Sequence, residues 1–164
     1  MQWGTLATVT PSIAALLVDA SERFLGEALG RLESAGFPNL SVSHAFAMQL
    51  IDAGVTTITA LADVMRMSPQ AVSAIVDQLE ARGYVARTRQ ADDARAKVLA
   101  LTAAGRSLAA AIAGSLAEAE AEWADLVGRE RLADVAAALH AYVADGASSG
   151  AARVPRRQRR VRIV

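Results

Sequence analysis

The sequence predicts a mainly α-helical protein with one small β-hairpin. Two short helices begin at side-chain caps, because Thr57 precedes one apolar stripe at helical spacing and Ser68 precedes another. Pro69 suits the first position of the second helix, where a proline loses no hydrogen bond. After Gly83 the pattern changes to a twofold alternation, which predicts two strands. Helix, helix and hairpin, in this order, form a winged helix-turn-helix.

The two short helices each have one apolar face. We expect the first helix to end near Arg66, and Gly83 to provide the left-handed stop of the second. The apolar positions of the two helices are, in order, Ile58, Leu61, Ala62, Met65, Val72, Ile75, Val76 and Leu79. The residues that the second helix then points outward are Gln70, Ser73, Ala74 and Asp77.

The predicted hairpin spans residues 84–101 and has basic strands. Its outgoing strand carries Arg87 and Arg89, and its return carries Arg95 and Lys97. Thr102 then opens another helix. No pair of residues in this segment suggests catalysis. The geometry suits a helix that enters a major groove of DNA and a hairpin that lies against the neighbouring backbone or minor groove.

Short motifs follow one another through this segment: Leu61-Ala62, Ser68-Pro69, Val72-Ser73, Leu79-Glu80 with Gly83, Asp93-Ala94-Arg95, and Leu101-Thr102 with Gly105. In order and spacing they resemble the MarR (multiple antibiotic resistance regulator) family of bacterial transcription factors, over less than a third of the chain. The resemblance implies a DNA-binding dimer in which helices from both termini intertwine. It also implies repression relieved by a small, often aromatic or phenolic ligand, bound between the dimer helices and the winged unit. The chain departs from the family at Ala74 and Ala94, where members often carry arginine or lysine.

Composition excludes several other classes of protein. The chain has 164 residues and is 53% apolar, so general disorder is excluded. It has no cysteine, and its only histidines are His44 and His140, so we expect neither a thiol switch, a metal site nor a cofactor. No segment suggests secretion or a membrane span, and we expect a cytoplasmic protein.

Charge is unevenly distributed along the chain. Six arginines and no acids follow Gly150, which leaves 11 bases against 17 acids in the rest of the chain. Residues 57–101 carry six bases and five acids and are about neutral. Non-specific DNA affinity depends on neutralising phosphates, so we expect it to be modest without the arginine tail.

The segments before and after the winged unit are predicted to form long helices with apolar stripes. Residues 40–53 are predicted to form a further helix. The stripe positions are Ile13, Leu16, Leu17, Ala20, Phe24, Ala28, Leu32, Leu108, Ile112, Leu116, Ala119, Trp123, Leu126, Leu132, Val135, Ala136, Leu139 and Val143. A monomer would leave much of this surface exposed, so we expect a homodimer. The predicted division is an N-terminal dimerisation helix in residues 1–36, a winged unit in 37–103, C-terminal dimerisation helices in 104–146, and a basic tail in 147–164.

These observations predict a sequence-specific DNA-binding transcriptional regulator that binds a palindromic operator as a homodimer. The family resemblance implies that it is a ligand-responsive repressor. Gln70 and Ser73 would read base edges in the major groove. Ser68 and Pro69, at the helix N-terminus, would hold a phosphate. Arg95 would enter the minor groove, oriented by Asp93. The remaining phosphate contacts are expected from Arg87, Arg89 and Lys97.

Two other classes of function stay open. A winged helix can be a protein-interaction module that does not read DNA sequence, and Ala74, Ala94 and the near-neutral winged unit favour this alternative. An enzyme is the weakest reading, because no nucleophile with a nearby base, no metal-ligand cluster and no glycine-rich phosphate loop is found. Residues that line an effector pocket are not identified by the sequence.

Overall fold

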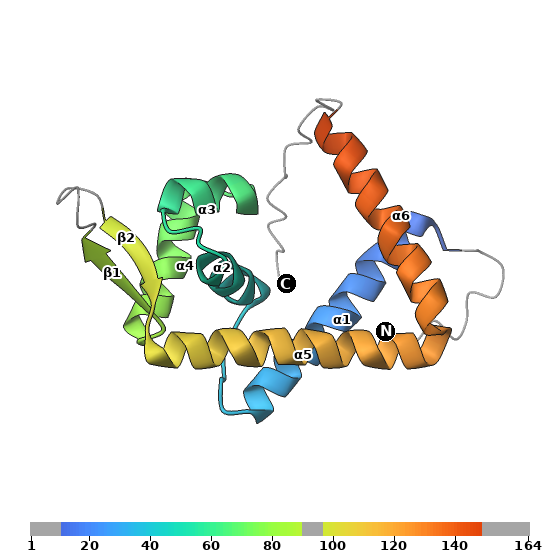
Figure 1. Ribbon diagram of the computed structural model, residues 1–164, viewed down its shortest axis with the longest axis horizontal. Coiled ribbons are helices and arrows are strands. Elements are labelled where there is room, and N and C mark those ends of the chain that lie inside the picture. The colour runs from blue at the N-terminus through green and yellow to red at the C-terminus, as the bar shows by residue number, and fades with distance from the viewer. Residues whose placement is uncertain (1–10, 90–96, 149–164) are drawn as a thin grey trace, which may run out of the picture. The chain divides into compact units, whose positions relative to one another are not determined.

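The structure is a computed structural model that describes residues 11–89 and 97–148. The chain divides into two compact units, residues 1–121 and 122–164. The described elements (Figure 1) are α1 (Ile13–Ser34), α2 (Val42–Asp52), α3 (Ile58–Met65), α4 (Pro69–Ala81), β1 (Val85–Arg89), β2 (Lys97–Leu101), α5 (Ala103–Val127) and α6 (Arg129–Ser148). The fold is therefore a winged helix, mainly α with a small hairpin, as the sequence predicts.

Side-chain caps set the starts of the two short helices. The Thr57 hydroxyl accepts a hydrogen bond from the Ala60 N–H at 3.2 Å, and the Ser68 hydroxyl accepts one from the Ala71 N–H at 3.2 Å. These bonds satisfy amide groups that have no partner within their own helix. Arg66 then takes a left-handed conformation with φ 53°, which ends α3 at the turn. The predicted caps and the end of the first helix are confirmed.

The start of α2 differs slightly from the prediction. Ser41 caps this helix through the His44 N–H, and His44 bonds back to the Ser41 N–H, which forms a capping box. The helix therefore begins at Val42, two residues after the predicted start at residue 40. A histidine in the third helical position replaces the usual Glu or Gln of this motif, which is why sequence patterns alone did not locate it.

The core of the first unit lies where α2, α3 and α4 meet the hairpin, the end of α1 and the start of α5. Every apolar residue predicted to face inward on α4 is buried. The buried cluster consists of Leu32, Ala47, Met48, Ile51, Leu61, Ala62, Val72, Ile75, Val76, Leu79, Val85, Leu99, Leu108, Ala109 and Ile112. This shared core fixes α4 relative to the elements around it.

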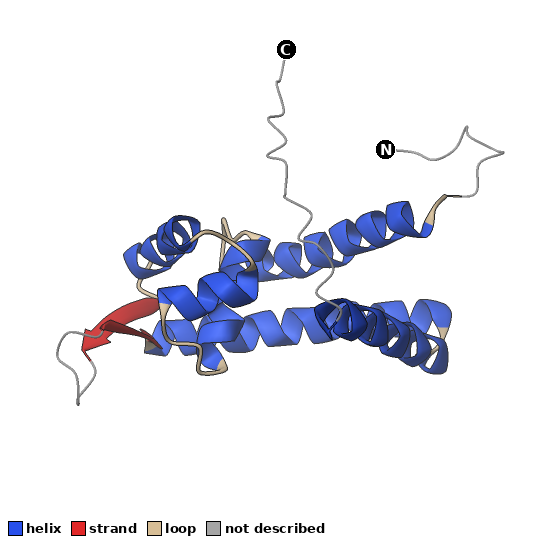
Figure 2. Cartoon of the chain, turned by 90° about the horizontal axis from the view of Figure 1, so that it is seen from above, coloured by secondary structure: helices blue, strands red, loops and turns tan. Residues whose placement is uncertain are grey.

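The hairpin pairs β1 with β2 in antiparallel register, from Val85 opposite Leu101 to Arg89 opposite Lys97. Figure 2 shows the two strands side by side at one edge of the helical cluster. Leu99 is buried, and its N–H donates a 2.8 Å hydrogen bond to the carbonyl of Thr56. Strand β2 is therefore attached to the segment that leads into α3.

A close contact joins the base of the hairpin to α5. The Thr102 N–H donates to the Tyr84 carbonyl at 3.0 Å, while its hydroxyl donates to the Gly83 carbonyl at 2.6 Å. The same hydroxyl accepts from the Gly105 N–H at 3.0 Å and so caps α5. A Cβ on Gly105 would lie only 2.0 Å from the Tyr84 carbonyl oxygen. The Leu-Thr and glycine motif thus has a structural reason: threonine ties the junction together and glycine allows the approach.

The terminal helices carry apolar side chains that the single chain leaves exposed. On α1 these are Ile13, Leu16, Leu17 and Val18, whereas Ala28 and Leu32 near its end are buried. In the second unit, α6 exposes Val135, Leu139, Tyr142 and Val143. Over residues 11–89 and 97–148, no helix combines the length and the apolar character that crossing a membrane requires.

Candidate nucleic-acid interface

The first turn of α4 is the exposed end of the helix-turn-helix. Ser68, Pro69 and Gln70 are exposed, and Ser73, one turn later, is half-buried. Because the Ser68 oxygen accepts from Ala71, its hydroxyl proton can donate to another group. Helix N-terminal amide groups and their dipole favour a nearby anion. The structure therefore gathers four of the predicted DNA-binding residues at one helix end.

The same helix is held by the buried side chain of His44 on α2. This side chain is only 6% exposed, and its Nδ1 accepts hydrogen bonds from the Ser41 N–H at 3.0 Å and the Ser41 hydroxyl at 2.9 Å. Its Nε2 lies 2.9 Å from Gln78 Oε1 on α4, and must carry the proton because the amide oxygen can only accept. Burial lowers the pKa of His44, opposed by the hydrogen bond to Gln78 and reinforced by the charge of Arg82. His44 is therefore a neutral link between α2 and α4, a role that sequence reasoning missed.

This link predicts a pH dependence of folding. Below pH 6.5, its ordinary pKa, His44 of the unfolded chain takes up a proton, whereas the folded state resists protonation until lower pH. The free energy of unfolding should therefore fall as pH drops from about 6.5 towards the folded-state pKa. Urea unfolding of wild type and of His44→Gln at a series of pH values measures this, and the variant should lose that part of the dependence. His140→Gln is the matched control and should keep it; equal pH profiles for wild type and His44→Gln would refute the assignment.

The structure gives Arg87 two acidic partners on α4. Its guanidinium Nη2 lies 2.5 Å from Asp77 Oδ1, and its Nη1 pairs with Glu80 Oε2. The hydrogen bond that Arg87 donates to Asp77 is the main cause of a raised pKa for Arg87, and burial opposes it. The Arg87 side chain is 23% exposed. Its contact with phosphate stays a prediction, and any phosphate would compete with these two carboxylates.

The remaining predicted residues are Arg89, Asp93, Arg95 and Lys97. The backbones of Arg89 and Lys97 pair opposite one another at the ends of β1 and β2. Asp93 and Arg95, together with Ala94, lie outside the described residues. The proposed minor-groove contact of Arg95 therefore rests on the sequence.

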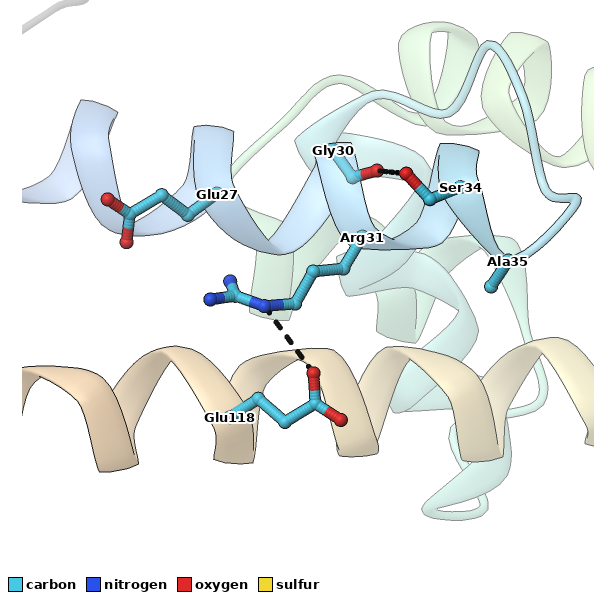
Figure 3. Close-up of a pocket in the computed structure, with 6 residues that line it drawn as sticks. All are labelled: Glu27, Gly30, Arg31, Ser34, Ala35 and Glu118. Carbon is cyan, nitrogen blue, oxygen red and sulfur yellow. Dashed lines mark hydrogen bonds and ion pairs between the residues drawn. The ribbon is translucent and has the colours of Figure 1, made fainter.

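A surface groove between α1 and the middle of α5 was not predicted (Figure 3). Arg31 reaches across it, with its Nε 3.4 Å from Glu118 Oε2. On the α1 side, the Ser34 hydroxyl donates to the Gly30 carbonyl at 3.0 Å. The six lining residues are Glu27, Gly30, Arg31, Ser34, Ala35 and Glu118. None is aromatic and two are acidic, so the groove itself indicates no aromatic ligand.

Residues 39–96, which contain α2, the helix-turn-helix and β1, match the sequence model of the MarR family. This segment of the chain is therefore similar to the MarR family. Among curated proteins, none matches it. The exposed first turn of α4 and strand β1 both lie within the matched segment.

Solved structures of MarR-family proteins are similar over most of the chain. The repressor CouR, bound to a 23-mer DNA duplex, is 25% identical with a TM-score of 0.68, over 88% of this chain and 98% of CouR. CouR from Rhodococcus jostii RHA1 bound to p-coumaroyl-CoA is 24% identical with a TM-score of 0.65, over 80% and 91%. A MarR family protein of Mycobacterium tuberculosis in complex with salicylic acid is 22% identical with a TM-score of 0.63, over 84% and 99%. The structures with p-coumaroyl-CoA and with salicylic acid, both under 25% identical, show that the chain shares their fold.

Proposed function

We propose that this protein is a sequence-specific DNA-binding transcriptional repressor of the MarR family that acts as a homodimer on a palindromic operator. The observation that carries this proposal is the capped, exposed first turn of α4, held on a buried core directly beside a hairpin. A helix enters the major groove most readily by its exposed N-terminal end, while a neighbouring hairpin follows the backbone. The similar CouR structure contains a DNA duplex.

Each predicted contact except that of Arg87 has a role in this arrangement. Gln70 and Ser73 read base edges, because amide and hydroxyl groups pair with the donors and acceptors of the major groove. Ser68 and Pro69 place the helix N-terminus against a phosphate. Arg89 and Lys97 contact phosphates further along the hairpin, and Arg95 with Asp93 reaches the minor groove at its tip.

The dimer is proposed to cover the exposed apolar faces of the terminal helices. Ile13 is 77% exposed and Leu16 is 50% exposed in the single chain, at positions one turn apart on α1. On α6, Val135, Leu139 and Val143 repeat at a spacing of four residues and are also exposed. Burying apolar area is the main favourable term in subunit association, so a second copy would stabilise both faces.

We further propose that a small aromatic effector regulates DNA binding in the cytoplasm. The similar proteins were solved with salicylic acid and with p-coumaroyl-CoA, which both contain an aromatic ring. An effector shifts an operator-binding equilibrium only if it binds one state better than the other. Titrating simple aromatic acids into the protein–operator complex tests this part of the proposal.

The test of DNA reading compares two variants that should fail in different ways. Arg95→Ala is expected to lose roughly 1–3 kcal/mol of operator affinity, because an arginine in a narrow minor groove meets an enhanced negative potential. Gln70→Ala should instead relax the preference at particular base pairs. Fluorescence anisotropy on an operator and on a scrambled duplex measures both losses, with circular dichroism as the control for folding. If Arg95→Ala binds the operator as tightly as wild type, the role given to the wing is wrong.

A protein-interaction module is the second candidate function. It is favoured by Ala74, which is exposed on the outward face of α4 and offers no hydrogen bond to a base. Under this alternative, the exposed face of α4 contacts another protein, and duplex binding shows no sequence preference. Operator and scrambled duplex would then be bound equally at every salt concentration.

A further inference from the structure

An ion-pair cluster joins the hairpin β1–β2, which forms the wing, to α4, the helix proposed to enter the major groove. Asp77 and Glu80 are three residues apart on α4 and so share one face of the helix. Arg87, on β1, spans both: its two terminal nitrogens bond to different carboxylates. A guanidinium is planar and rigid, so two such bonds restrict its orientation as well as its position.

Other contacts hold the hairpin mainly at its base and along β2. Thr102 bonds to the Gly83 and Tyr84 carbonyls, and Leu99 bonds to the Thr56 carbonyl. Val85 is buried at the start of β1. Arg87 lies two residues further towards the tip and bonds directly to α4, so it limits how far β1 can swing away from that helix.

The net negative charge of this cluster disfavours phosphate binding. One arginine with two carboxylates has a net charge of −1, counted over Arg87, Asp77 and Glu80. The Asp77 side chain is 59% exposed on the outward face of α4, where an added anion would meet it. Both carboxylates are at least partly exposed, Asp77 at 59% and Glu80 at 38%. Ion pairs with such exposed partners add little to stability, so stability alone does not account for two acids at this place.

We propose that Arg87 is a positioning residue for DNA recognition, which sets the angle between the base-reading face of α4 and the wing through Asp77 and Glu80. This inference rests on the proposed function. With this angle fixed, α4 can contact the major groove while the hairpin contacts the adjacent minor groove. Both contacts can then form at the same time. The specificity of the protein then depends on two acidic residues that themselves repel DNA.

The competing role of Arg87, a phosphate contact, predicts opposite results. The decisive variant is Asp77→Asn with Glu80→Gln, which keeps the arginine and removes the negative charge of both its partners. A positioning role predicts that the ratio of operator to scrambled-duplex affinity falls about tenfold, the size expected for a misplaced base contact. A phosphate role predicts that operator affinity rises with an unchanged ratio, because the cation is released and two anions are lost.

Two substitutions of the arginine complete the experiment. For a positioning role, Arg87→Gln lowers the same ratio by about tenfold and leaves the slope of log affinity against log salt unchanged. Arg87→Lys does not restore the ratio, because lysine cannot bond both carboxylates in a fixed geometry. If Arg87 contacts a phosphate, the slope of log affinity against log salt should be smaller by about one for Arg87→Gln. Arg87→Lys should then restore the wild-type affinity and slope.

A matched control removes the same charge elsewhere in the winged unit. Asp52→Asn with Asp63→Asn neutralises two exposed acids on α2 and α3 and should keep the wild-type ratio. Thermal unfolding verifies that each variant is folded, and Glu80→Gln alone carries the same prediction, with a smaller loss, if the double variant unfolds. A wild type without operator preference would overturn the proposed function. A wild type with that preference, and an unchanged ratio in Arg87→Gln and in the acid variant, would overturn the positioning role alone.

Discussion

Gly105→Ala should destabilise the protein by about 3 kcal/mol, because overpacking a rigid junction forces the backbone to move. The added Cβ would stand 2.0 Å from the Tyr84 carbonyl oxygen and 3.0 Å from its carbon. Both neighbours are backbone atoms, so no side chain can rotate away. Relief requires α5 to shift from the base of the hairpin, which would also break the Thr102 bonds to Gly83 and Tyr84.

Gly114→Ala provides the control on the same helix. A Cβ there meets nothing within 4 Å, so the helix gains the higher propensity of alanine, about 1 kcal/mol. Urea unfolding followed by circular dichroism measures both variants. We expect the two changes in stability to have opposite signs, and a Gly105→Ala protein as stable as wild type would contradict the geometry of the junction.

Leu16→Asp should convert the protein from a dimer to a monomer at micromolar concentration. Leu16 lies among exposed apolar residues on α1, and each subunit would bring one buried carboxylate into the proposed interface. Burying an unpaired charge costs more than the roughly 1.5–3 kcal/mol that a buried leucine contributes. The variant should also lose operator affinity, because each subunit of the dimer binds one half-site of the palindrome and a monomer can bind only one.

Val64→Asp is the matched control for this change. Val64 on α3 is 50% exposed, the same as Leu16, but belongs to neither terminal helix. The Val64→Asp protein should remain dimeric, as measured by light scattering. A folded wild-type monomer, or a Leu16→Asp dimer as tight as wild type, would exclude the terminal helices as the dimer interface.

Local chemistry explains why much of the fold could be predicted from the sequence. The caps at Thr57 and Ser68 act within three residues, and the left-handed glycine at position 83, with φ 75°, depends only on the backbone around it. The apolar face of α4 follows from helical periodicity, which is also a property of the segment alone. These features placed Ser68, Pro69, Gln70 and Ser73 at one exposed helix end.

The unpredicted parts depend on contacts between distant segments. Gln78 lies 34 residues from His44, and only the packing of α2 against α4 brings them together. The partners of Arg87 are closer in sequence, yet alternating bases on a strand equally suggest phosphate contacts. The sequence identified Gly105 as part of a motif, whereas its reason, the approach of the Tyr84 carbonyl, is visible only in the fold.

The proposal that this protein reads DNA sequence as a dimer is tested most directly by selecting bound duplexes from a random DNA pool. Wild-type protein should enrich an inverted repeat whose half-site centres are separated by about one helical turn or a multiple of it, as two-fold symmetry requires. Binding to the enriched duplex should weaken as salt is raised. A selected pool with no sequence enriched over the input would contradict the account.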